Sequence, residues 1–279
     1  MHKRLFAKLG AQRMQYPQVL DYAAVAVTLL FFAVGSVYDL KTREVSDKVW
    51  VVYGLCGLAL TVVRLSIEPS TIVLSLVSIG ITTGVSMALF YFGLFGGADA
   101  KATICLALAV PVIPNIVQPL IGYLHPFFPI VVLISGFVCS ISVSVWLGIE
   151  NLGRIARKGF RIFDGLQNEP WWDKALGSIT GYPTGVTNLR STFYLYPMEE
   201  IATDSFGRSY RKFHFFFGAE ADREKLVSEY VASLAKVGSP QTVWVSPGLP
   251  MLVFMFIGLI ITLFAGDIVF RGIFSLAFH

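Results

Sequence analysis

The sequence predicts an all-α polytopic membrane protein with about six transmembrane helices and a small α/β domain between the fifth and the sixth. Three observations lead to this fold class. Hydrophobic residues make up 55% of the chain and charged residues only 14%, with a mean hydropathy of +0.67. Soluble domains carry about 25% charged residues. Long uncharged apolar runs recur along the chain, and a single polar region, residues 150–247, interrupts them.

Six apolar segments are expected to span the membrane, because a helix needs about 20 residues to cross the hydrocarbon core. They are residues 18–38, 49–63, 71–95, 102–124, 126–149 and 248–266. The second is short, so flanking residues must join it while Lys48 and Arg64 extend outward. The fourth contains three prolines, so its helix is expected to kink or to end early.

These spans divide the chain into three parts. Residues 1–149 form a membrane domain with five helices, residues 150–247 form an α/β domain, and residues 248–279 form the sixth helix and a tail. Within the α/β domain, "STFYLYP" and "YRKFHFFFG" favour strands. The segment "AEADREKLVSEYVASLAKVG" has the apolar periodicity of an amphipathic helix.

Basic residues predict the orientation. Four of them follow the fifth span: Arg154, Arg157, Lys158 and Arg161. The positive-inside rule therefore places residues 150–247 in the cytoplasm, and the loops between spans one and two and between spans three and four on the same side. The basic N-terminus disagrees, since six spans would place it outside. We expect a multi-pass protein of the plasma membrane.

Two aspartates stand at one predicted face of the membrane. Asp39 ends the first span, and Asp99 follows the third span in "GLFGGADAKA". Acidic groups at a membrane boundary are functional candidates. Two close carboxylates share a proton, so one can activate water while the other donates to a scissile carbonyl. This chemistry needs no metal or other cofactor, and the four histidines and three cysteines show no ligand spacing.

Residues beside the aspartates form a candidate supporting motif. Gly96 and Gly97 precede Asp99 and allow unusual backbone angles and a close approach of an extended substrate. Lys101 either acts on the charge of Asp99 or is an ordinary interfacial lysine.

Structural interpretations stand beside the catalytic ones. Asp99 is suited to capping the fourth span, and Asp39 to pairing with Lys41 or Arg43. Glu44 and Asp47 either attract a cationic peptide or are solvated loop charges.

The two aspartate motifs together resemble those of the type IV prepilin peptidases, which are GxGD membrane aspartyl proteases. "YDLKTREVSDKVW" is similar to their first motif and "GGADAKA" to their second. "EPWWDKALGSITGYPTG" and "TVWVSPGLPMLVF" are similar to segments of the archaeal preflagellin peptidase branch. The resemblance implies that Asp39 and Asp99 are the catalytic pair. It also implies that the protein removes a basic leader from preflagellin or prepilin-like precursors at the cytoplasmic face.

Two other classes of function remain open. An ion-coupled transporter could use the same aspartates, although transporter sites cluster at mid-membrane. A receptor or scaffold would leave the paired aspartates unexplained. The net charge of +4 without a block of like charges predicts no nucleic-acid partner. The expected partners are membrane lipid and the precursor proteins that the resemblance implies. Because the aspartates stand at the ends of different spans, at least one is expected to move before chemistry.

Overall fold

The structure is a computed structural model that describes residues 2–122, 125–215, 223–238 and 240–277. It divides into two compact units. Unit 1 comprises Met1–Cys139 and Pro250–His279, and unit 2 comprises Ser140–Leu249. Three predicted features lie outside the described residues. They are the basic side chains of the N-terminus, the end of the strand predicted at 210–218 and the start of the helix predicted at 219–238.

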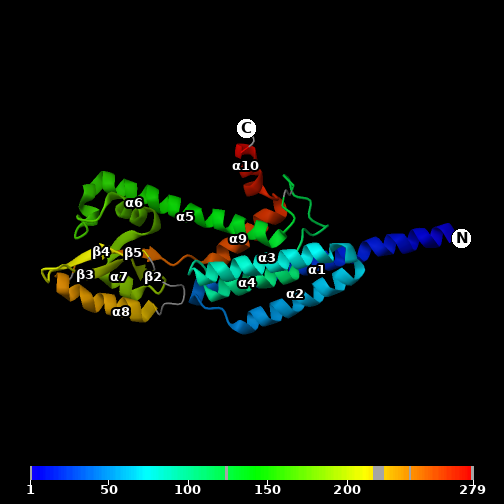
Figure 1. Ribbon diagram of the computed structural model, residues 1–279, viewed down its shortest axis with the longest axis horizontal. Coiled ribbons are helices and arrows are strands. Elements are labelled where there is room, and N and C mark those ends of the chain that lie inside the picture. The colour runs from blue at the N-terminus through cyan, green and yellow to red at the C-terminus, as the bar shows by residue number, and fades with distance from the viewer. Residues whose placement is uncertain (1, 123–124, 216–222, 239, 278–279) are drawn as a thin grey trace. The chain divides into compact units, whose positions relative to one another are not determined.

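Unit 1 is built from helices (Figure 1). Its elements are α1 (His2–Thr42), α2 (Asp47–Ile67), η1 (Pro69–Thr71), α3 (Ile72–Tyr91), α4 (Gly97–Ala109), α9 (Met251–Phe264) and α10 (Ile268–Ala277). Helix α5 (Phe128–Lys158) begins in unit 1 and continues into unit 2. Four described segments are long and apolar enough to cross a membrane: Pro17–Thr42, Asp47–Ile67, Pro69–Tyr91 and Phe128–Arg157.

The expectation of six spans is therefore confirmed only in part. The helix predicted over 102–124 ends at Ala109, after 13 residues. Val110 precedes Pro111, and the residue before a proline is pushed out of the helical region; its φ is −137° and its ψ is 71°. Helix α9 has only 14 residues. Both short helices are packed among the longer ones, where they need not span the bilayer alone.

Small residues allow the helices of unit 1 to approach closely. A Cβ on Gly57 of α2 would lie 2.7 Å from the Cβ of Ala109, so α4 rests directly against α2. A Cβ on Gly258 of α9 would lie 2.5 Å from the backbone nitrogen of Gly136 in α5. Such contacts are typical of membrane helices, whose interfaces favour small side chains. They hold α4 and α9 in the interior of the unit.

Among its described residues, unit 2 contains two small antiparallel sheets and three α-helices besides the end of α5. Figure 1 labels these elements. Strands β1 (Tyr182–Gly185), β5 (Thr242–Pro247) and β2 (Leu195–Pro197) form one sheet in the order β1-β5-β2, and β3 (Glu199–Thr203) and β4 (Ser209–Phe213) form a hairpin. The register pairs Tyr182 with Val245 and Glu199 with Phe213. The remaining elements are η2 (Gly159–Phe163), α6 (Trp171–Thr180), α7 (Val186–Ser191), α8 (Arg223–Leu234) and η3 (Ala235–Val237). The predicted amphipathic helix is thus confirmed over its described part.

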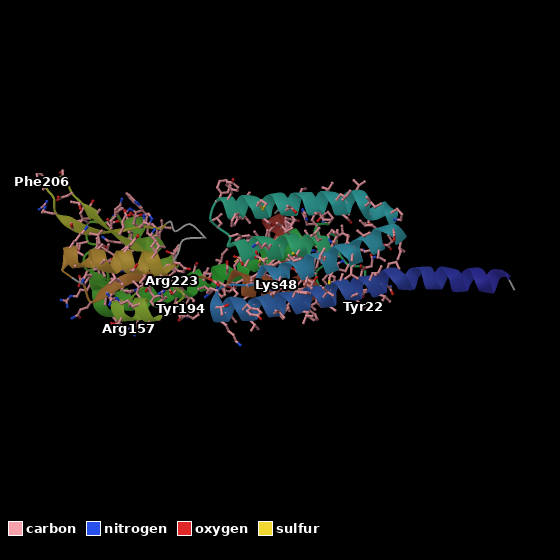
Figure 2. The ribbon with its side chains drawn as sticks, turned by 90° about the horizontal axis from the view of Figure 1, so that it is seen from below. Tyr22, Lys48, Arg157, Tyr194, Phe206 and Arg223 are labelled. Atoms are coloured by element: carbon pink, nitrogen blue, oxygen red, sulfur yellow. The ribbon has the colours of Figure 1, made fainter. Side chains whose placement is uncertain are left out.

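A buried carboxylate organises the interior of unit 2. Glu199 accepts hydrogen bonds from Nε and Nη2 of Arg211 at 2.6 Å, from the Tyr230 hydroxyl at 2.8 Å and from the Trp244 backbone N–H at 2.6 Å. Its side chain is fully buried. A buried charge is tolerated when it is paired and hydrogen-bonded in this way. At the far end of the β3–β4 hairpin, the side chain of Phe206 extends into solvent (Figure 2).

Candidate active site

Asp39 lies in the last turn of α1, where it contacts the first turn of α9. Its Oδ2 accepts a hydrogen bond of 3.2 Å from the backbone N–H of Leu252. The hydroxyl of Ser36, one turn earlier in α1, donates to the carbonyl of the same Leu252 at 3.2 Å. Asp39 is only 9% exposed. The N–H groups of a first helical turn lack partners within their own helix, so this turn can supply one to a carboxylate.

Asp99 is the third residue of α4. Its Oδ2 accepts a 3.1 Å hydrogen bond from the backbone N–H of Gly96, which precedes the helix. The hydroxyl of Thr103, one turn later, donates to the carbonyl oxygen of Asp99 at 2.8 Å and lies 3.9 Å from the sulfur of Met255 in α9. Helix α9 therefore contacts both aspartate-bearing segments.

The two carboxylates interact electrostatically, although 60 positions separate them in the sequence. The charge of Arg43 acts on both of them. Its Nη1 lies 3.7 Å from Oδ1 of Asp39, and its backbone has a φ of 59° in the left-handed region. This backbone conformation ends α1 and turns the chain toward α2.

The structure gives the backbone angles and the contacts of the predicted supporting residues. Gly96 has an ordinary extended backbone, with φ −73° and ψ 159°, and Gly97 begins α4. Neither requires glycine for its backbone angles; the left-handed glycine of this segment is Gly93, with φ 70°. The close approach at Gly96 involves the Oδ2 of Asp99, which a Cβ there would meet at 3.2 Å.

Lys101 pairs with Asp47 at the start of α2, and their Nζ and Oδ1 atoms are 2.6 Å apart. Residues two positions apart on a helix do not face each other, so Lys101 points away from Asp99. Arg43, whose pairing with Asp39 was one of the structural interpretations, is the cation that acts on the two aspartates. The capping interpretation of Asp99 also corresponds to an observed hydrogen bond, since its side chain accepts from Gly96. Neither contact excludes chemistry at the same carboxylates.

Two further acids of unit 1, Asp21 and Asp267, are buried. Oδ1 of Asp21 lies 3.1 Å from Nε of Arg64, and its Oδ2 accepts a 2.7 Å hydrogen bond from the backbone N–H of Asn115. Asp267 accepts a 3.1 Å bond from the backbone N–H of His125. Both acids thus bind backbone N–H groups of the segment that joins α4 to α5. In Figure 2, Lys48 marks the end of unit 1 near Asp47, and Tyr22 lies farther along α1.

Among the described residues, no group of three or more His, Cys, Asp or Glu side chains could hold a metal ion. Sequence reasoning missed Arg43 as the shared cation and missed Leu252 altogether, because a backbone N–H leaves no signature in the residue type.

Two family models match the chain. The model described as type IV leader peptidase family matches residues 26–144, which include both aspartates. The model described as archaeal peptidase A24 C-terminus type II matches residues 173–268, which include most of unit 2 and all of α9. The chain is therefore similar to the type IV leader peptidase family over the part that holds both aspartates.

Two relatives of this chain are both named preflagellin peptidase. The protein from Methanococcus voltae is 25% identical over 255 residues, which cover 88% of this chain and 95% of the relative. The protein from Methanocaldococcus jannaschii is 28% identical over 143 residues, which cover 49% of this chain and 59% of the relative. These similarities make the chain a protease of the prepilin peptidase type and a multi-pass membrane protein.

Proposed function

We propose that this protein is a membrane aspartyl endopeptidase in which Asp39 and Asp99 cleave the leader from preflagellin or prepilin-like precursors. The observation that carries the proposal is that Asp39 of α1 and Asp99 of α4 lie close enough for the charge of one to act on the other. Each carboxylate has one oxygen held by a backbone N–H, from Leu252 or from Gly96. Fixed carboxylates with a shared charge environment are suited to a proton-sharing pair.

In the proposed reaction, the ionised carboxylate removes a proton from water as the water oxygen attacks the scissile carbonyl carbon. The protonated carboxylate donates a hydrogen bond to the carbonyl oxygen and stabilises the negative charge that develops there. Collapse of the tetrahedral intermediate breaks the C–N bond, and the leaving amine takes up a proton from the pair. The two carboxylates titrate as one unit, so the mechanism assigns the shared proton to the pair.

The anchoring contacts suggest how the pair could adjust to a substrate. Asp39 is tied to α9 through Leu252, whereas Asp99 is tied to the residue before its own helix. The two segments can therefore shift relative to each other without losing these bonds. We propose that one of them moves when a precursor binds, because the family's substrate must place its peptide bond between the two carboxylates.

The proposed substrate and membrane side follow from charge and from the relatives. Both relatives are named preflagellin peptidase. The basic residues after the fifth span favour a cytoplasmic location for unit 2 and for the aspartate pair in the plasma membrane. Glu44 is exposed near Asp39, where a carboxylate attracts a basic leader peptide.

A cleavage assay tests this proposal. The purified full-length protein is reconstituted in liposomes with a preflagellin that retains its leader, and the product's new N-terminus is mapped by mass spectrometry. We expect one cut between the basic leader and the hydrophobic helix. Intact precursor after incubation, together with proton or cation flux through the same liposomes, would instead support the transporter alternative.

A further inference from the structure

Helix α6 in unit 2 has two unlike faces. Gly177 is buried, and a Cβ there would lie 3.0 Å from the ring of Phe213. The opposite face carries four large apolar side chains in the open: Trp171, Trp172, Leu176 and Ile179 are exposed by 75%, 54%, 46% and 43%. Soluble proteins seldom leave such a contiguous group of large apolar residues uncovered.

The position of α6 along α5 is fixed by specific contacts within unit 2. The side-chain amide of Asn151, which is fully buried, donates to the carbonyl oxygens of Ser178 at 2.8 Å and Gly181 at 2.7 Å. A Cβ on Gly148 would lie 3.3 Å from Cγ2 of Ile179, so the two helices touch at this point. The end of α6 therefore lies beside residues 148–151 of α5.

These residues of α5 correspond to a definite depth in a bilayer. The candidate span begins at Phe128. At 1.5 Å per residue, the 20 residues to Gly148 extend about 30 Å, the thickness of the hydrocarbon core. Beyond Gly148, Ile149 and Leu152 of α5 are still apolar and are each 67% exposed. The apolar surface of α5 thus continues past the core, over the same stretch of α5 that α6 contacts.

We propose that the exposed apolar face of α6 is a membrane-interface contact, inserted between lipid headgroups and hydrocarbon where α5 leaves the bilayer. Tryptophan side chains favour this layer of a membrane, because their rings are apolar and their N–H groups are polar. Arg157 and Arg161 follow at the end of α5 and in η2 with exposed side chains. Long arginine side chains reach lipid phosphates from just outside the core. The exposed apolar residues of α5 at the level of α6 identify lipid as the occupant, ahead of a soluble partner.

The inference rests on the membrane insertion that the proposed function also assumes, and it is independent of the aspartate chemistry. The chain has five tryptophans, which allow the test to be made by fluorescence. The full-length protein is placed in lipid nanodiscs with bromine on the acyl chains, either near the headgroup or near the bilayer centre. The wild type is compared with a Trp171→Phe/Trp172→Phe variant and with a Trp146→Phe variant. Trp244, which is buried in unit 2, reports folding in all three.

The emission of Trp171 and Trp172 is the component that is missing from the Trp171→Phe/Trp172→Phe variant. We expect bromines near the headgroup to quench this component, and bromines near the bilayer centre to quench it more weakly. The inference would be overturned if neither bromolipid quenched this component while the emission of Trp146 was quenched. Something other than lipid would then cover α6. Absence of quenching at Trp146 as well would overturn it for a different reason. That result would remove α5 from the membrane and with it the membrane basis of the proposed function.

Discussion

Gly96 offers a test of how closely the position of the Asp99 carboxylate is controlled. Its φ of −73° and ψ of 159° suit alanine, so the Gly96→Ala change introduces no backbone strain. The new Cβ would lie 3.2 Å from Oδ2 of Asp99, and the carboxylate must withdraw by a few tenths of an ångström. This movement also stretches the 3.1 Å hydrogen bond from the Gly96 N–H. A misplacement of 1 Å costs about 100-fold in rate, so we expect a loss of roughly 3- to 10-fold in kcat/KM.

Gly97 provides a matched control one residue away. A Cβ at Gly97 would lie 3.9 Å from Cε2 of Phe90, an ordinary van der Waals contact, and Gly97 already has a helical backbone. Gly97→Ala should therefore retain activity within about twofold, and each variant should change stability by about 1 kcal/mol or less. Initial cleavage rates over a range of precursor concentrations, with thermal unfolding of each variant, give the comparison. Equal activity of the two variants would refute the reasoning that Gly96 keeps the carboxylate in place.

Three further predictions concern residues outside the aspartate pair. Glu199→Gln should destabilise unit 2 by about 3 kcal/mol and reduce hydrogen-exchange protection of its strands roughly 100-fold, because it leaves the buried Arg211 without its charge partner. The control Glu200→Gln changes a half-exposed side chain and should leave the protection unchanged. Equal protection in both variants would contradict this prediction. The pKa of Asp204 is lowered below its usual value, mainly by the hydrogen bond from the backbone N–H of Arg208. The ionised Asp204 therefore stabilises the β3–β4 turn above about pH 4, and this stability is lost as the pH falls through the lowered pKa. Hydrogen exchange corrected for intrinsic rates should show this loss in the wild type and not in Asp204→Asn. Lys101→Met should change cleavage less than about twofold, because an exposed ion pair contributes about 0–1 kcal/mol; a tenfold loss would show that Lys101 acts on the reaction.

Much of unit 1 follows from hydropathy and from counting crossings. Long apolar runs predict α1, α2, α3 and α5, and an even number of crossings between Asp39 and Asp99 predicts that both acids return to one end of the bundle. The electrostatic interaction between the two carboxylates agrees with that expectation. Prolines after Ala109 also predict an early end to the fourth helix, although not that α4 is as short as it is.

Contacts between distant segments could not be predicted in the same way. The hydrogen bond from Leu252 to Asp39 uses a backbone N–H, which every residue except proline possesses, so no residue type marks it. The buried pair of Asp21 and Arg64 joins positions far apart in the sequence, and each residue alone resembles an interfacial charge. In unit 2, the short strands β1 and β5 escaped the sequence analysis because β1 contains proline and glycine and β5 continues into an apolar helix.

The central claim is that Asp39 and Asp99 together carry out proteolysis, and isosteric asparagine variants test it most directly. Cleavage of a preflagellin is measured for the wild type, Asp39→Asn and Asp99→Asn in the same lipid, with Asp47→Asn as the matched control on an exposed aspartate. We predict that each of the first two variants remains folded and loses about 10²- to 10⁴-fold in rate, the range that general acid–base catalysis supplies. Asp47→Asn should cleave at nearly the wild-type rate. Wild-type cleavage by either Asp39→Asn or Asp99→Asn would contradict the account.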